Sequence, residues 1–180
     1  KPLTVHATQA TLEIIQAHIF NWAIWPDFSE IPNRDKPFMR YAETRVGKAV
    51  KVEGREMTPL PANHTVPAVG YRIDSGEGSL VFSGDTSVCD ELWKAVNKIR
   101  NLRYLIIETA FSNRERQLAI ASKHLCPDML KGELLKLQRE AEIYITHLKP
   151  GQIELTMQEI EEFIGEYKPR MLQNNQVFDL

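Results

Sequence analysis

The stretch Ser79-Leu80-Val81-Phe82-Ser83-Gly84-Asp85-Thr86 joins a short apolar run to a glycine and an acid. Ser79–Phe82 is nearly all apolar, which is typical of a strand covered on both faces. A second such run, Ile143–Ile145, leads into Thr146-His147-Leu148. Loops at the edge of a sheet expose side chains to small molecules. An acid and an imidazole at the ends of buried strands therefore indicate a candidate metal site that is assembled from distant parts of the chain.

Segments of strand and helix character alternate along the chain. Short β-type patterns predict strands over residues 3–7, 46–57, 66–73, 79–82, 104–108 and 143–146. Helices are expected from an N-cap at Thr8 to about Asn21, over 92–99, 117–125 and 128–142, and from a capping box at Thr156–Glu159. This alternation favours an α/β fold in which helices cover a sheet. At 180 residues, one domain over 1–180 is the expectation.

The charge balance bears on the choice of partner. The chain carries 22 basic and 24 acidic residues, a net charge of −2. We therefore expect no nucleic-acid partner and no membrane partner, because both need a basic surface or a long apolar segment. The two cysteines, Cys89 and Cys126, are too few for a disulfide framework and are expected to be reduced.

A set of ionisable residues lies at strand ends or in loops, in the order His64, Asp85, Glu108, His124 and His147. Imidazole nitrogens and carboxylate oxygens suit zinc, manganese or iron. Each residue also has a purely structural interpretation. Asp85 could cap the following helix, Glu108 could be a solvated strand end, and His124 could be a helix C-terminal cation. Spacing alone leaves both interpretations open.

The order of short motifs resembles a known family. His64-x-x-x-x-x-Gly70-Tyr71, Ser-Gly-Asp-Thr, Glu-Thr-Ala-Phe, Lys-His-Leu and Thr-His-Leu together resemble the C-terminal half of the metallo-β-lactamase fold. The stretches His18–Phe28 and Phe111–Arg114 are similar to class II cyclic-nucleotide phosphodiesterases of that fold. The resemblance to the tRNA 3′-processing ribonucleases is more distant. The resemblance runs from Val5 to about Phe163.

The resemblance implies a fold, a site and a reaction. The fold would be a metallo-β-lactamase-like αββα sandwich, of which this chain supplies mainly the C-terminal half. Two divalent metal ions are implied, zinc first, with manganese and iron as alternatives. His64 would bind one metal, His147 the other, and Asp85 would bridge them. A hydroxide held between the metals would open 3′,5′-cyclic nucleotides, cAMP or cGMP, to 5′-nucleotides.

Further roles are implied for the remaining positions. His124 would lie over the scissile phosphate, and Glu108 would orient it and hold it protonated. Asn21 and nearby aromatic residues would line the nucleotide pocket. Those aromatics, Trp22, Trp25 and Phe28, could stack on a base or could form a satellite hydrophobic cluster.

The sequence departs from the family pattern at one point. The signature His-x-His-x-Asp-His, which supplies four metal ligands in the family, is absent. We therefore expect a chain that lacks the N-terminal part of its fold domain. The alternatives are an RNA-processing nuclease of the same fold and a non-catalytic domain. A small cyclic nucleotide is the expected ligand and a homodimer the expected assembly. The compartment stays open between cytoplasm and periplasm.

Overall fold

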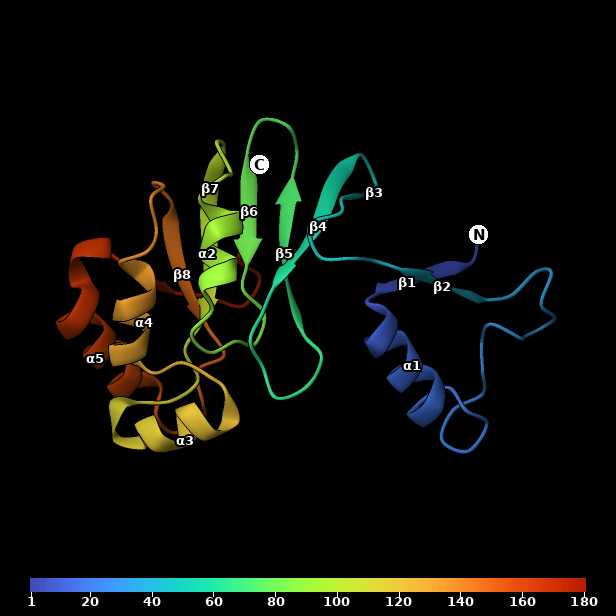
Figure 1. Ribbon diagram of the computed structural model, residues 1–180, viewed down its shortest axis with the longest axis horizontal. Helices are drawn as coiled ribbons and strands as arrows, with labels where there is room; N and C mark the ends of the chain where they lie inside the picture. Colours follow the sequence, from blue (N-terminus) through green and yellow to red (C-terminus); the bar gives the residue numbers. More distant parts are fainter. The chain divides into compact units, whose positions relative to one another are not determined.

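The computed structural model describes residues 1–180 (Figure 1). It forms two compact units, Lys1–Lys48 and Ala49–Leu180. No helix in it is both long enough and apolar enough to cross a bilayer. The expectation of a single domain over the whole chain stays a prediction.

The first unit is built on one strand pair and one helix. Strand β1 (Leu3–Ala7) runs parallel to β2 (Met39–Glu43), and α1 (Gln9–His18) lies between them in sequence. Thr8 is the N-cap, and its Oγ1 accepts a hydrogen bond from the N–H of Thr11. The predicted strand, cap and start of the helix are therefore confirmed, whereas the helix ends at His18 rather than near Asn21. The aromatic stretch that follows α1 contains no helix or extended strand.

The second unit carries a seven-stranded sheet in the order β3 to β9. Strands β3, β4, β5 and β6 pair in antiparallel fashion, whereas β6, β7, β8 and β9 pair in parallel. Their bounds are Val50–Val52, Arg55–Pro61, Val69–Asp74, Ser79–Phe82, Leu102–Glu108, Glu142–Thr146 and Arg170–Met171. Strands β6, β7 and β8 are largely apolar in sequence, because side chains on both of their faces are buried by other groups.

Helices cover one face of this sheet. They are α2 (Asp90–Val96), α3 (Arg116–Ser122), α4 (Pro127–Leu134) and α5 (Ile153–Ile164), with short 3₁₀ turns η1 (Asn113–Glu115) and η2 (Gly165–Tyr167). Val81, Leu105 and Ile145 point from the sheet into one core with apolar residues of α2, α4 and α5. On the other face, Tyr144 and Ile106 pack with Phe178 of the C-terminal tail.

The strand directions bring several chain segments to one edge of the sheet. The carboxyl ends of β6, β7 and β8 share an edge because these strands are parallel. Strand β4 is antiparallel to β5, which is antiparallel to β6, so the carboxyl end of β4 lies at this edge as well. The loops after these strands carry the candidate residues that the sequence singled out.

Several predicted helix limits are wrong. The helix expected over 92–99 spans Asp90–Val96. The helix expected over 128–142 ends at Leu134. Asn97 explains the ending, because its side chain donates to the carbonyl of Lys136 and accepts from the N–H of Gln138. The helix expected over 117–125 ends at Ser122, where Lys123 takes a left-handed conformation.

The last helix begins one turn before the predicted capping box. Gln152 is the N-cap of α5, and Thr156 is fully buried inside the helix. Thr156, Ile160 and Ile164 recur at a spacing of four and form the buried face of α5. Thr156 therefore contributes to packing rather than to capping. The strand expected to start at 46 starts only at Val50.

Candidate metal and catalytic site

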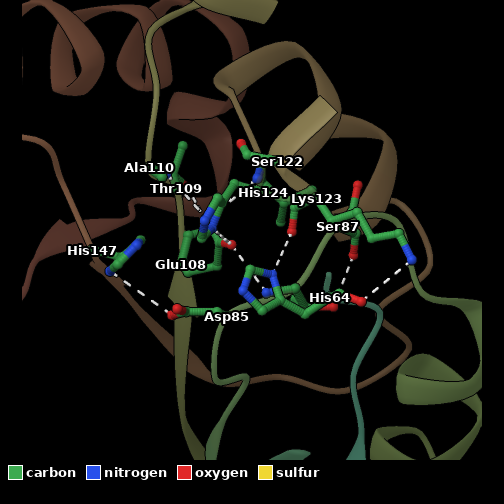
Figure 2. A network of polar contacts seen from close by, with 12 residues as sticks. His64, Asp85, Ser87, Glu108, Thr109, Ala110, Ser122, Lys123, His124 and His147 are labelled. Atoms are coloured by element: carbon green, nitrogen blue, oxygen red, sulfur yellow. Dashed lines mark hydrogen bonds and ion pairs between the residues drawn. The ribbon is translucent and has the colours of Figure 1, made fainter. Parts of the chain in front are cut away.

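Five of the predicted site residues converge at the edge where β4, β6, β7 and β8 end (Figure 2). The loop between β4 and β5 supplies His64, and Asp85 follows β6. Glu108 is the last residue of β7, His147 follows β8, and His124 lies beyond α3.

The position of Asp85 depends on two glycines. Gly84 has φ +63, and a Cβ there would lie 2.7 Å from the carbonyl oxygen of Val69. A Cβ at Gly70 would lie equally close, at 2.7 Å, to the carbonyl oxygens of Phe82 and Ser83. Only glycine allows β5 to approach the end of β6 this closely. The sharp turn at Gly84 then exposes the Asp85 carboxylate, whose side chain is 44% accessible.

Glu108 is fully buried and holds the loops together. Its Oε1 accepts from the N–H of Thr86 at 3.0 Å, and its Oε2 accepts from the N–H groups of Ala110 and Leu125 at 3.1 and 3.2 Å. Burial raises the pKa of Glu108 to about 7, although the hydrogen bonds from Thr86 and Leu125 work against this. The alternative interpretation of Glu108 as a solvated strand end is thus wrong.

His124 is the remaining partner of Glu108. Its Nδ1 lies 2.7 Å from Glu108 Oε1. Because every other contact of that carboxylate comes from an N–H donor, the geometry fits an Nδ1–H that donates to Glu108 and leaves Nε2 free. Burial lowers the pKa of His124, while the nearby Asp85 carboxylate acts in the opposite direction. The expectation that Glu108 holds His124 protonated stays a prediction.

The other two histidines flank His124. The ring centroid of His124 lies 4.9 Å from that of His64 and 4.9 Å from that of His147, with which it stacks. His147 Nδ1 lies 3.8 Å from Asp85 Oδ1. His147 has φ +66, a left-handed conformation that a non-glycine residue rarely adopts. Backbone strain of this kind is often found at functional sites.

The donor set fits a divalent metal ion. Ligand atoms of His64, Asp85 and His124 all lie within 4.8 Å of one another. Two imidazoles and a carboxylate match the preference of zinc and related ions. The sequence grouped His147, rather than His124, with His64 and Asp85; in the structure His147 adjoins the same group. The separate metal and catalytic roles of these histidines stay predictions.

Asn21 lies in the turn after α1. It belongs to the first unit, where its side chain donates to the carbonyl of Ala17 and accepts from the N–H groups of Ala23 and Ile24. These bonds give Asn21 a local structural role in the turn after α1. Its predicted role in a nucleotide pocket stays a prediction.

Sequence reasoning missed two lysines at the site. Two hydrogen-bond contacts join Lys123 and His64. The Nζ of Lys149 lies over the ring of Phe111, 5.5 Å from its centroid. Phe111 in turn packs edge-on against His124. Neither lysine is paired with a carboxylate. The only available signal was sequence proximity, since Lys123 precedes His124 and Lys149 follows His147 by two residues.

Comparison with known proteins assigns the chain to a family. Residues 2–166 match the beta-lactamase superfamily domain. The chain belongs to this superfamily. Its membership confirms the α/β, metallo-β-lactamase-like fold that the motif order implied.

Individual relatives are distant. A curated protein of Yersinia pestis, a probable 3′,5′-cyclic-nucleotide phosphodiesterase, is 24% identical over 174 residues, covering 82% of this chain and 50% of that protein. The chain therefore spans about half the length of this curated relative. Among solved structures, unliganded yeast PDE1 matches 96% of this chain and 58% of its own, with 18% identity and a TM-score of 0.79. YhfI from Bacillus subtilis, a metallo-beta-lactamase fold protein, matches 99% of this chain and 65% of its own, with 16% identity and a TM-score of 0.72.

Proposed function

We propose that the protein is a metal-dependent phosphodiesterase that hydrolyses 3′,5′-cyclic nucleotides to 5′-nucleotides. The observation that carries this proposal is the convergence of His64, Asp85 and His147 with the Glu108–His124 pair at one sheet edge. The name of the Yersinia pestis relative supports the substrate class.

His64, Asp85 and His147 would hold divalent metal ions, zinc first, and His124 lies beside them. Bound metal ions supply Lewis acidity and a nucleophile derived from water at neutral pH. The protein groups bind and orient the phosphodiester. Lys149 adds a positive charge near His124; burial is the main cause of the lowered pKa of that imidazole, and Lys149 makes a smaller contribution in the same direction.

His124 is suited to proton transfer at Nε2. Glu108 anchors Nδ1, so Nε2 is directed toward the site (Figure 2). A phosphodiester anion beside Nε2 would raise the pKa of His124, because an opposite charge favours the protonated imidazole. His124 would then take up a proton as substrate binds and give it to the 3′ oxygen as the P–O bond breaks. General acid catalysis of this kind contributes about 10²–10⁴-fold.

Asp85 provides the direct test. In the enzyme loaded with zinc, Asp85→Asn keeps the size of the side chain but removes the charge that would bind metal. We expect lower metal content by elemental analysis and loss of cAMP and cGMP hydrolysis. Asp90→Asn, an exposed change on α2, is the matched control and should leave both unchanged. Full metal content together with full hydrolysis in Asp85→Asn would refute the proposal.

An RNA-processing nuclease of the same fold is the second candidate. Human tRNase Z, short form, matches 84% of this chain with 15% identity and a TM-score of 0.57, which is a likeness of fold alone. Nucleases of this kind need a basic surface, and affinity for RNA falls steeply with salt. We expect no tRNA binding at low salt; tight, salt-sensitive binding would favour the nuclease instead.

A further inference from the structure

Lys123 and His64 are joined by a reciprocal pair of contacts across 59 positions of sequence. The Nδ1 of His64 lies 3.2 Å from the carbonyl oxygen of Lys123. The ammonium of Lys123 donates in return to the carbonyl oxygen of His64 at 3.3 Å. Figure 2 shows both contacts on the side of His64 that faces away from Asp85. The two bonds tie the loop after β4 to the segment after α3.

The first contact determines the tautomer of His64. A carbonyl oxygen can only accept, so Nδ1 must carry the proton. In the neutral imidazole, Nε2 is then unprotonated and free to coordinate. The Nε2 edge of the ring is directed toward Asp85 and the space beside His124 (Figure 2). Hydrogen bonds of this kind to the second nitrogen orient metal-binding histidines and increase their basicity.

The backbone of Lys123 is shaped for this contact. Lys123 is the C-cap of α3, with φ 56 and ψ 51, and its N–H bonds to the carbonyls of Ala119 and Ile120. The left-handed conformation ends the helix and turns the Lys123 carbonyl toward His64. The next residue is His124, whose N–H also bonds to Ala119. One turn of chain thus positions both His64 and His124.

We propose that Lys123 is a positioning residue, which fixes the tautomer and orientation of His64 so that its Nε2 is ready to bind metal. The inference rests on the proposed metal-binding function, but it concerns a different property of the chain. The Nδ1–H tautomer is the less favoured form of a free neutral histidine, so its presence at His64 requires a specific partner. Lys123 provides that partner through its carbonyl and holds it in place through its ammonium.

Three substitutions separate this role from general stability. Lys123→Met removes the ammonium, whereas Lys123→Arg retains a donor and should restore the wild-type behaviour. Lys123→Gly removes the side chain but suits the left-handed conformation. Lys168→Met is the matched control, because Lys168 is also a left-handed C-cap, follows η2 and makes no contact with the site histidines.

The experiment measures the ring nitrogens of His64 by ¹H–¹⁵N correlation in metal-free protein, with assignment by a His64→Gln variant. Wild type, Lys123→Arg and Lys168→Met should show the Nδ1–H form. Lys123→Met and Lys123→Gly should show a mixture with the Nε2–H form. Zinc affinity, measured by competition with a chelator, should fall about 10- to 100-fold in the same two variants, while the melting temperature of Lys123→Gly stays at or above that of wild type.

The outcomes are distinguishable. An unchanged His64 tautomer in both Lys123→Met and Lys123→Gly would overturn the inference, and so would an equal loss of zinc affinity in Lys168→Met. If wild type binds no zinc, the proposed function fails, yet the tautomer measurement still decides the role of Lys123.

Discussion

Individual residues at this site are held in conformations that few side chains adopt. Gly84, Lys123 and His147 all have left-handed backbones and lie next to or within the cluster of Asp85 and the three histidines. Such conformations persist only where surrounding contacts over-determine them. The geometry of the site therefore depends on backbone conformation as well as on the clustered side chains.

Gly84→Ala tests this dependence. The new Cβ would meet the Val69 carbonyl at 2.7 Å in a left-handed backbone. We expect a loss of about 2–5 kcal/mol in the free energy of unfolding, from backbone strain and overpacking together. Gly76→Ala is the matched control, because Gly76 has φ +95 but nothing within 4 Å of its Cβ position. Urea denaturation should show a loss of only about 1–2 kcal/mol there; equal losses would contradict the argument from close approach.

Glu108 should make stability depend on pH. Burial raises its pKa from 4.5 to about 7, so between these values the folded state binds more protons than the unfolded state. The contribution of Glu108 is therefore fully present below pH 4.5 and declines as pH rises through 7. In metal-free protein, we expect the stability of wild type relative to Glu108→Gln to fall by about 3 kcal/mol between pH 4.5 and 8. A difference that stays constant across this range would contradict the expectation.

At the scale of elements, a buried acid connects two helices that cover the sheet. Glu133 of α4 accepts from the indole N–H of Trp93 at 2.7 Å and from the N–H of Cys89 at 2.9 Å. Cys89 is the N-cap of α2 and lacks a capping side chain of its own. Glu133 of α4 thus accepts a hydrogen bond at the N-terminus of α2, and the ammonium of Lys136 offsets its negative charge.

Replacing Glu133 should weaken the contact between α2 and α4 and lower the stability of the protein. Glu133→Leu leaves two buried N–H donors without acceptors, so we expect a loss of about 3–5 kcal/mol in unfolding free energy. Glu154→Leu, on an exposed position of α5, should change it by no more than about 0.5 kcal/mol. Thermal and urea unfolding would measure the free energy of unfolding of both variants. A near-neutral Glu133→Leu would show that the network is dispensable.

At the scale of the whole molecule, the second unit carries the complete seven-stranded sheet and the clustered site residues His64, Asp85, Glu108, His124 and His147. Its core of sheet and helix residues lies entirely within Ala49–Leu180. A unit with its own hydrophobic core can in principle fold alone.

A chain of residues 49–180 should therefore unfold cooperatively and give a well-dispersed NMR spectrum. It should also keep the hydrogen-bonded ring of His124, because both His124 and Glu108 belong to this unit. A chain of residues 62–180 lacks β3 and β4 and leaves β5 as an unpaired edge, so we expect it to be much less stable. A disordered spectrum for residues 49–180 would contradict the independence of the unit.

The sequence by itself determined the class of fold and the order of the site residues. Apolar runs such as 79–82 and 143–146 predict buried strands wherever they occur, because burial of both strand faces leaves no room for polar alternation. The motifs around His64, Asp85 and His147 pointed to one superfamily. Helix limits such as those near Leu134 and Thr156 were predicted wrongly, because partners distant in sequence decide where those helices begin and end.

Only the tertiary structure decided how the site is held. The contacts of Glu108 with the N–H groups of Thr86 and Leu125, and of Lys123 with His64, join residues that are from 17 to 59 positions apart. No local pattern encodes such pairs, because hydrogen bonds form between groups that folding brings together. The protonation preferences of Glu108 and His124 follow from burial, which is likewise a property of the folded chain.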